Sequence, residues 1–502
     1  MFRLFFYGMG MALIFTHQAS AANLGIDEIL HLARQNSPEP KQDRYRLDEA
    51  RAGQESIDQV IDWTVFGNAS GVDDQTEDSS ALGGDSRRYR EYKIGLRKAM
   101  HTGTSFELSA VRSKTLVNMP ASSTAGTGLP SFSFGPTYNP DYTTGVTLAV
   151  RQDLWRNFFG REVKLQKAAM GSAVVLATFD RAVKLQLVQG EAETLTWELI
   201  ALNERVRLSR SLLRSSREFS TGMEKRLRLG RANDVDVAAA RSLVIENESA
   251  VLALEIARDK LARRLAARIW GTQAGQRVPA VAGSVPATNP WKPPASRAEA
   301  MTRALADRLE LRALREQRVP LQAAFDLAAE KDKPSVALFG SLGGLGRGET
   351  ESASADGWSN RRKTMIGLQF EMNLSGTESR TGQARARAQL QMLDARRDIF
   401  VMEIRREIDD IYTSLNGADR QLTQYRRHLR TLQDQVAAEK RRVRQARSDR
   451  VATLRYEMEL NAARMERIEA LRSRRIAETR LRLALHAYPG VPAALATGEE
   501  QP

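Results

Sequence analysis

The feature that most constrains the fold is a row of apolar or small residues spaced three and four positions apart. Its members are Val401, Ile404, Ile408, Ile411, Leu415, Ala418, Leu422, Tyr425, Leu429, Leu432 and Val436. Such spacing, kept for about five heptads, predicts a coiled-coil seam on one long helix. A helix over residues 378–448 would be roughly 105 Å long at about 1.5 Å per residue, longer than a small domain is wide. The sequence therefore predicts a projecting helical hairpin.

Each of two long helical regions contains one break. Residues 160–270 are interrupted at Gly230, just before an Asn-Asp pair that favours a turn and a helix start. The second region, 378–487, is interrupted in the stretch ARSDRVATLRYEMEL. With the register described below, Asp449 stands where the first region has Gly230, and aspartate is among the few side chains that tolerate the left-handed conformation. Both breaks are predicted to be chain reversals.

Segments of alternating polarity precede each helical region. In residues 92–111, Tyr92, Ile94 and Leu96 alternate with polar or small residues, and the alternation resumes after a tight turn at residues 101–103, which predicts a hairpin. Similar strands are predicted at 63–71, 143–154, 335–344 and 363–374. One apolar and one polar face suit a wall between lipid and water, although a half-exposed sheet would alternate in the same way.

The order of helix, strands and helical hairpin occurs twice, which predicts an internal duplication. The motif QDL at 152–154 aligns with MNL at 372–374 at an offset of 220 residues. The first copy carries an extra hairpin, residues 90–115, flanked by long connections at 72–89 and 112–142. Outer-membrane barrels have this asymmetry of long outer and short inner connections.

The first residues resemble an export signal. They contain Arg3, an apolar stretch over 4–15 and Ala19-Ser20-Ala21, so we expect cleavage before Ala22 rather than a membrane anchor. The chain has no cysteine, so neither disulfides nor a lipid-modified N-terminal cysteine are expected.

The formal net charge of +14 does not by itself indicate a nucleic-acid partner. Basic residues are interleaved with acidic ones along amphipathic helices, which is typical of solvated helix faces, so no nucleic-acid partner is expected. An enzyme is the least favoured class, because His31, His101, His428 and His486 are scattered and the glycine-rich stretch at 340–348 lacks the Lys-Ser/Thr pair of a phosphate loop. No cofactor and no metal are expected.

Two motifs resemble the TolC family of outer-membrane efflux factors: QDLWRNFFGREVKLQKA (152–168), at the strand-to-helix junction, and LGRANDVDVAAAR (229–241), at the hairpin turn. The resemblance implies an α+β fold in which long coiled-coil hairpins form a periplasmic α-barrel and antiparallel transmembrane strands are shared in a trimeric β-barrel. It also implies a passive channel in the outer membrane of a Gram-negative bacterium. The implied partners are outer-membrane lipid, two further copies of the chain, a periplasmic adaptor and an inner-membrane pump of RND, ABC or MFS type.

The resemblance also assigns site residues at the two reversals. The positions that would contact the adaptor are Leu229, Gly230, Arg231, Asp449 and Arg450. Asp236 matches an acid of the periplasmic aperture, although an acid in a first helical turn is also favoured by the helix dipole alone. Where some members place a tyrosine, an arginine and an acidic ring, this chain has Ala446, Val451 and Arg455, so the aperture of Asp236 and Arg455 must be locked differently.

These expectations divide the chain into nine segments. They are the export signal (1–21), a periplasmic helix (22–61), strands with an extra hairpin (62–154), a helical hairpin (155–270), a proline-rich linker (271–296), a second periplasmic helix (297–332), further strands (333–374), a second helical hairpin (375–487) and a flexible tail (488–502). An exported coiled-coil tether or adaptor without a pore is the alternative. The exported substrate, whether drug, metal ion or secreted protein, stays open, and so does whether residues 90–115 raise a trimeric barrel from about twelve to about eighteen strands.

Overall fold

A computed structural model describes residues 24–75, 86–118, 140–275, 277–281, 284–286, 289, 291–359 and 361–489. The expected export signal and much of the 112–142 connection lie outside these residues. The chain divides into two compact units. The helical unit comprises Met1–Arg44, Phe179–Glu310 and Ile399–Pro502, and the sheet unit comprises Tyr45–Thr178 and Leu311–Asp398.

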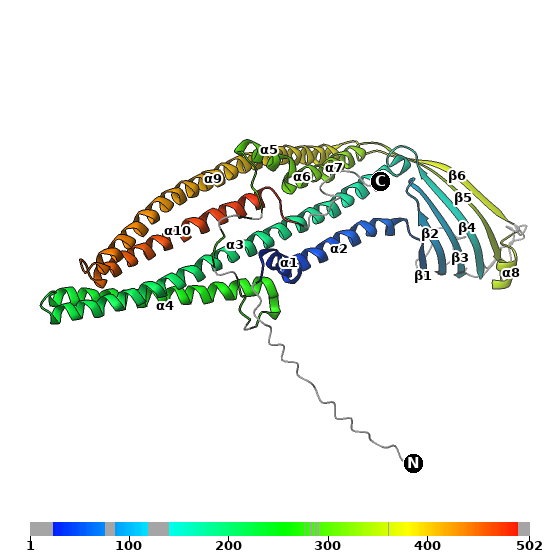
Figure 1. The fold of residues 1–502 in the computed structure, drawn as a ribbon. Coiled ribbons are helices and arrows are strands. Elements are labelled where there is room, and N and C mark those ends of the chain that lie inside the picture. Colours follow the sequence, from blue (N-terminus) through cyan, green and yellow to red (C-terminus); the bar gives the residue numbers. More distant parts are fainter. Residues whose placement is uncertain are drawn as a thin grey trace, which may run out of the picture. The chain divides into compact units, whose positions relative to one another are not determined.

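Most of the described chain is helical (Figure 1). The α-helices are α1 (Ile26–Asn36), α2 (Pro38–Asp58), α3 (Arg161–Arg228), α4 (Asp234–Trp270), α5 (Arg297–Asp307), α6 (Leu309–Glu316), α7 (Arg318–Glu330), α8 (Glu351–Asp356), α9 (Thr377–Arg444) and α10 (Arg450–Ala484). The helices expected at 22–61 and 297–332 are each divided. Ser37 is extended because Pro38 follows it, and proline disfavours the helical conformation of the preceding residue. Within the described residues, no helix is both long and apolar enough to cross a membrane.

The predicted coiled-coil seam is confirmed as a buried row on α9. Nine of its eleven members are less than 10% exposed; Val401 and Tyr425 are half-buried. Leu429, Leu432 and Val436 of α9 form a cluster with Leu460 and Ala463 of α10. This packing joins the two helices of the second hairpin.

The core of the helical unit collects apolar side chains from α1, α3, α4, α9 and α10. Trp197 of α3 and Leu265 and Ile269 of α4 are completely buried. Val281 and Val285 of the proline-rich linker belong to the same cluster. The linker is thus irregular, as its prolines predict, but its apolar residues are part of the core.

The expected start of the flexible tail at residue 488 is wrong. Tyr488 is only 3% exposed, and its backbone exchanges hydrogen bonds with the side chain of Gln186. Its hydroxyl donates to Glu193 at 2.7 Å, and Arg482 lies over its ring. Tyr488 is held in place because its hydroxyl and the buried carboxylate of Glu193 satisfy each other's hydrogen bonding. Composition could not reveal this contact.

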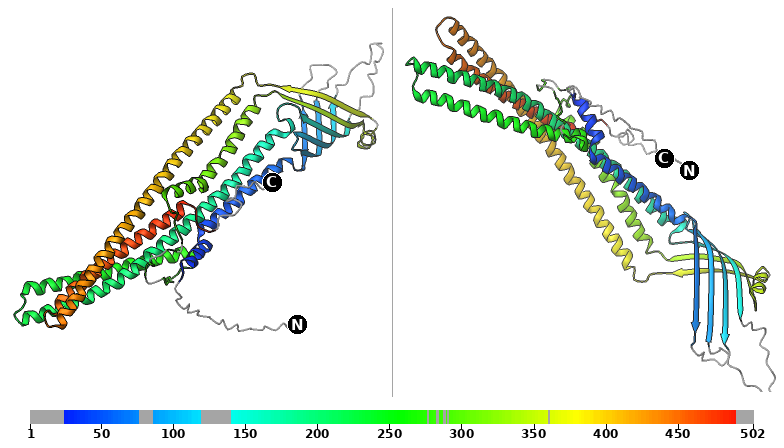
Figure 2. Two further views of the ribbon diagram at one scale, coloured as in Figure 1. Left: turned by 45° about the horizontal axis from the view of Figure 1, so that its top comes forward. Right: turned by 90° about the horizontal axis from the view of Figure 1, so that it is seen from below.

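The strands of the sheet unit form one antiparallel sheet in chain order (Figures 1 and 2). They are β1 (Thr64–Asp74), β2 (Ser86–Ala99), β3 (Thr104–Asn118), β4 (Asp141–Asp153), β5 (Ser335–Gly348) and β6 (Arg362–Glu371). The predicted hairpin is β2–β3, and it lies inside the sheet between β1 and β4. Strands β4 and β5, from the two halves of the chain, pair directly.

The register of the strands creates two different faces. Leu96, Leu108, Leu148 and Leu342 are directly opposite one another in one row across β2–β5, and this apolar face includes Ile94 and Ile366, which are 62% and 78% exposed. The polar face carries ion pairs between Lys93 and Glu107 at 3.0 Å and between Arg97 and Glu107 at 2.8 Å, among others. Because residues directly opposite share a face, the alternation predicted from the sequence is confirmed.

The tight turn of the β2–β3 hairpin packs against the junction between β4 and α3. Gly103 and Gly160 both have positive φ angles, of +73° and +69°, and a Cβ at Gly160 would collide with the carbonyl oxygen of His101. Next to this contact, Trp155, Phe158 and Phe159 are all more than half exposed. We call the end of the sheet with this short connection and these exposed aromatic rings the helix end, and the opposite end the loop end.

Candidate functional site

The first hairpin tip reverses the chain between α3 and α4. The N–H of Gly230 donates to Leu227 O at 2.9 Å and that of Arg231 to Arg226 O at 2.8 Å, which closes the end of α3. Gly230 has φ of +66°, and nothing lies within 4 Å of where its Cβ would be. The residue is glycine because of the backbone angle and not because of crowding.

The second tip has the same backbone pattern with different residues, and the expected role of Asp449 as its left-handed residue is wrong. Ala446 has φ of +52°, whereas Asp449 is extended at φ −119° and caps α10. Helices α3 and α9 both contain 68 residues, so Gly230 corresponds to Ala446 and Asn233 to Asp449. The offset of 220 residues, taken from the QDL and MNL motifs, misplaced the tip. The long helices of the two halves are related by a different offset from these motifs.

Two ion pairs join the two hairpin tips within the helical unit. Arg226 Nε of α3 donates to Asp449 Oδ2 at 2.8 Å, and Arg450 of α10 lies 3.2 Å from Glu218 of α3. Arg450 also pairs with Glu457 at 3.2 Å. The predicted residues Asp449 and Arg450 thus hold the two hairpins together, while Arg450 is exposed and Asp449 partly exposed at the tip.

A small apolar cluster supports these ion pairs. Met223, Val237, Ala240 and Val451 are buried together beside the tip. A Cβ at Gly222 would lie 2.6 Å from Val451 Cγ2, so only glycine there lets α10 approach α3 this closely. The sequence prediction missed Gly222, Arg226 and Glu218, because nothing in the local pattern of α3 shows which of its faces meets α10.

A groove of about 930 Å³ runs along the tips between the two hairpins. It is lined by Leu229, Arg231, Asp449 and Arg450, four of the five residues predicted to contact an adaptor. The basic side chains along it outnumber the acidic ones. Its lining also includes Arg217, Glu218, Lys225 and Arg226. The structure therefore brings most of the predicted tip residues to one basic groove.

The charges of the tip stabilise one another. Burial opposes ionisation of Asp449, but hydrogen bonds from Ala452 N and Arg226 and the positive charge of Arg226 outweigh it and lower the pKa of Asp449 below its ordinary 3.8. The pKa of Glu457 is lowered in the same way, against the effect of burial, by Lys440 and Arg450. Both carboxylates are therefore held in the charged form.

The two predicted aperture residues have local partners. Asp236 forms a capping box with Asn233: its N–H donates to Asn233 Oδ1 at 2.7 Å, and its own carboxylate accepts from Asn233 N at 3.2 Å. Arg455 lies 3.9 Å from Glu459, one turn further along α10. Within this chain, therefore, Arg455 and Asp236 do not pair with each other.

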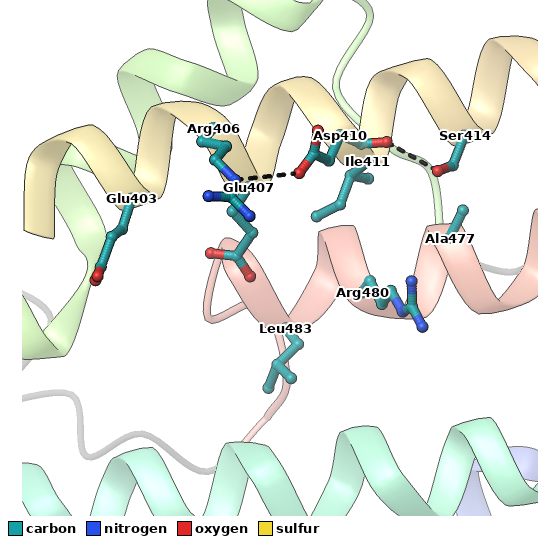
Figure 3. Close-up of a pocket in the computed structure, with 9 residues that line it drawn as sticks. All are labelled: Glu403, Arg406, Glu407, Asp410, Ile411, Ser414, Ala477, Arg480 and Leu483. Atoms are coloured by element: carbon teal, nitrogen blue, oxygen red, sulfur yellow. Dashed lines mark hydrogen bonds and ion pairs between the residues drawn. The ribbon is translucent and has the colours of Figure 1, made fainter.

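A second hollow of about 510 Å³ lies between α9 and α10 (Figure 3). Two of its three carboxylates are already paired: Asp410 lies 3.8 Å from Arg406, and Glu407 bonds to Arg308. Ile411, Ala477 and Leu483 form its apolar part. We assign no ligand to it. Among the described residues, no group of three or more histidine or acidic side chains could hold a metal ion.

Comparison with solved structures defines the class of fold. The chain resembles CusC, described for transmembrane channel formation, with a TM-score of 0.66, 14% identity and coverage of 92% of this chain and 91% of that one. It resembles the outer membrane protein VceC of Vibrio cholerae with a TM-score of 0.64, 14% identity and coverage of 92% and 96%. For the MtrE outer membrane channel of Neisseria gonorrhoeae the values are 0.62, 15%, 92% and 88%. No curated protein matches by sequence. The fold is that of a TolC-like channel, a mixture of long helices and antiparallel sheet.

A family model matches the second half of the chain. Residues 300–486 match the family model described as Outer membrane efflux protein. Over these 187 of 502 residues the chain is similar to outer membrane efflux proteins, in agreement with the resemblance of the two sequence motifs to the TolC family.

Proposed function

We propose that this chain is one protomer of a trimeric channel-tunnel that passively exports substrates across the outer membrane. An inner-membrane pump of RND, ABC or MFS type and a periplasmic adaptor would deliver the substrate, in multidrug or metal efflux or in type I protein secretion. The single observation that carries this proposal is the sheet with one apolar, exposed face and one ion-paired face. A wall that separates lipid from water needs both faces at once.

The barrel would be closed by three copies of the sheet. The described residues of each protomer form six strands, so three protomers would give about eighteen, as 6 × 3, rather than about twelve. The edges β1 and β6 are the strands whose free sides would pair with neighbouring protomers, since an exposed sheet edge presents unpaired backbone groups. The two halves of the chain, each with strands and a 68-residue helix, would be copies of one ancestral repeat.

The hairpin tips would be the surface that contacts the adaptor. Four of the predicted residues line a groove that is rich in arginine and lysine, so we expect an adaptor tip that presents acidic or carbonyl oxygen acceptors. Asp236 and Arg455 would line the aperture and face equivalent residues of neighbouring protomers. On opening of the aperture, the tip would move as one body, with the ion pairs of Asp449 and Arg450 kept intact.

Channel formation tests the proposal directly. The purified full-length protein should migrate as a heat-modifiable oligomer, fractionate with the outer membrane and give single-channel conductance in planar bilayers. A coiled-coil tether without a pore would be exported but would conduct nothing. Absence of conductance from correctly folded trimer would therefore favour the tether over the channel.

Cysteine labelling tests the wall, since the chain has no native cysteine. Leu108→Cys and Ala110→Cys should resist a membrane-impermeant thiol reagent because they would face lipid, whereas Glu107→Cys would face the water-filled interior and should react. Ser109 would face the same side, but it is only 9% exposed, so Glu107→Cys is the informative variant on the polar face. Uniform labelling from outside would show that β2–β3 is a solvated flap and that the larger barrel is wrong.

A further inference from the structure

The apolar face of the sheet ends, at the loop end, in a group of basic side chains that the channel function leaves unexplained. We call this group the basic rim: Arg88, Arg90, Arg112, Lys114 and Arg362. The register places Arg90 opposite Lys114 and Arg112 opposite Tyr92, on the same face as Ile94 and Leu108. Arg362 begins β6 at its loop end, and the register puts it on the same face as Ile94. All five side chains are exposed.

The basic rim lies at one edge of the apolar band. Lys98, at the helix end of β2, is eight positions from Arg90, at its loop end. At about 3.4 Å per residue this is about 27 Å along the strand, or about 20 Å across a membrane for a strand tilted by about 40°. Leu96, Ile94 and Tyr92 fill the space between. In the proposed channel the basic rim would therefore reach the level of the lipid head groups.

The two ends of this face differ in charge. Within the described strands, Lys98 is the only basic residue of the apolar face at the helix end, and it lies over the ring of Trp63. The basic rim has five basic residues and two acidic partners: Asp73 pairs with Arg88 at 3.2 Å, and Glu351 with Arg112 at 3.5 Å. The excess is three positive charges, from five minus two. Among the described residues, neither Arg90 nor Arg362 has an ion-pair partner.

The polar face of the same strands shows that the sheet can balance its charges. There Glu107 pairs with both Lys93 and Arg97, and Asp141 pairs with Arg347. Excess positive charge thus occurs on the face that would meet lipid. A charge beside an apolar band is costly unless an opposite charge meets it, so the excess indicates an anionic partner at that level of the membrane.

We propose that the basic rim binds the phosphate groups of a phosphate-bearing lipid in the leaflet at the loop end of the sheet. Guanidinium groups bind phosphate oxygens through paired hydrogen bonds, and Arg90 and Lys114, directly opposite each other, can hold one phosphate between them. Two aromatic residues lie at the same end: Tyr142, with Lys114 over its ring, and the partly exposed Trp358. Tyrosine and tryptophan are enriched at this level of membranes. The proposal rests on the proposed channel, because it needs the apolar face to meet lipid.

Lipid binding by matched variants tests the proposal. The probe is diphosphorylated lipid A, added to the full-length trimer in detergent and counted by native mass spectrometry, with the dephosphorylated lipid and inorganic phosphate as comparisons. The test variant is Arg90→Gln with Arg362→Gln. The control is Arg87→Gln with Lys363→Gln, which removes two positive charges from the same two strands but from the polar face.

The expected result is selective loss in the test variant. Each basic residue near an anionic membrane surface contributes about a fivefold effect, so the double variant should bind diphosphorylated lipid A about twenty-five-fold more weakly. The control should bind like the wild type. The proposal would be overturned if all three proteins bound the lipid equally or if both variants lost binding equally. It would also be overturned if the wild type bound the diphosphorylated and the dephosphorylated lipid equally well. Displacement of the lipid by inorganic phosphate would also overturn it, because the site would then be one for a free anion.

Conductance of the same samples separates the two proposals. If the wild type and both variants conduct equally while lipid binding fails to depend on the basic rim, the channel stands and the basic rim proposal falls. If the wild type binds no lipid and gives no conductance, both proposals fall.

Discussion

The two hairpin tips share one backbone geometry but reach it with different side chains. The first tip has glycine at its left-handed position and caps the next helix with Asn233, which forms a reciprocal bond with Asp236. The second tip has Ala446 at the left-handed position and caps with Asp449, which is held by Arg226 of the other hairpin. The first tip is thus stabilised locally, and the second depends on its neighbour.

The two tips therefore differ in conformational strain. A non-glycine residue in the left-handed region costs about 1–2 kcal/mol, so the second tip contains strain that the first lacks. The Arg226–Asp449 and Arg450–Glu218 ion pairs offset part of it. A tip that is strained and held from outside can move with small changes in those ion pairs, so we expect the second hairpin to be the more mobile one.

The largest expected effect comes from breaking the first tip. Gly230→Pro cannot adopt φ near +66° and loses the N–H that bonds to Leu227 O, so the local turn should be destabilised by about 3 kcal/mol or more. Membrane insertion should persist, whereas efflux measured by substrate accumulation should fall to background. Gly417→Ala is the matched control, since Gly417 lies inside α9 with open space around it. Full transport by Gly230→Pro would show that this tip is not part of the docking surface.

The second effect in size comes from the cap of α10. Asp449→Ala removes a helix cap worth about 1 kcal/mol and an exposed ion pair worth about 0.5 kcal/mol, so the second tip should lose about 1.5 kcal/mol. Amide hydrogen exchange should rise at residues 440–455. Asp449→Asn keeps the cap and loses only the ion pair, so it should show about a third of the effect. Equal exchange in Asp449→Asn and wild type would mean that Arg226 does not restrain this tip.

Exchanging the left-handed residues should have opposite effects at the two tips. Ala446→Gly removes the strain but adds backbone entropy to the unfolded chain, which leaves a net stabilisation of about 0.5–1 kcal/mol, whereas Gly230→Ala should destabilise by a similar amount. The double exchange should be close to neutral, as measured by hydrogen exchange at both tips. Destabilisation by Ala446→Gly would show that Ala446 makes contacts more favourable than its strain is costly.

Acid should loosen the second tip. The pKa of Asp449 is lowered on folding below 3.8 and that of Glu457 below 4.5. The stability that these groups contribute is therefore present above their unfolded pKa values and is lost as the pH falls from about 4.5 through the folded values. Hydrogen exchange at residues 440–457, corrected for the intrinsic rate, should rise below pH 4.5, and in Asp449→Asn the rise should be smaller. No difference between wild type and Asp449→Asn would assign the loosening to other carboxylates.

The sequence predicted the elements well because their signals are local. The seam of α9 and the alternation of β2 and β3 follow directly from side-chain periodicity, and both are confirmed. The contacts between elements were missed. Tyr488 is held by Glu193, which is distant in the sequence, and Asp449 was given a left-handed conformation because only the tertiary fit shows that Ala446 adopts it. The predicted tip residues do gather in one groove, but the roles that the resemblance implies for them remain predictions.

The smallest expected effect on stability distinguishes the two roles of Asp236. Asp236→Asn keeps an oxygen that accepts from Asn233 N and loses only the charge near the start of α4, so stability should fall by about 0.3–1 kcal/mol at most. Asp234→Asn, one position inside the same helix start, removes the same charge from the same dipole and is the control. If Asp236 faces the aperture, only Asp236→Asn should raise the conductance of the resting channel in planar bilayers. Equal conductance in both variants would reduce Asp236 to a capping residue, and the acid of the aperture would have to be sought elsewhere on α4 or α10.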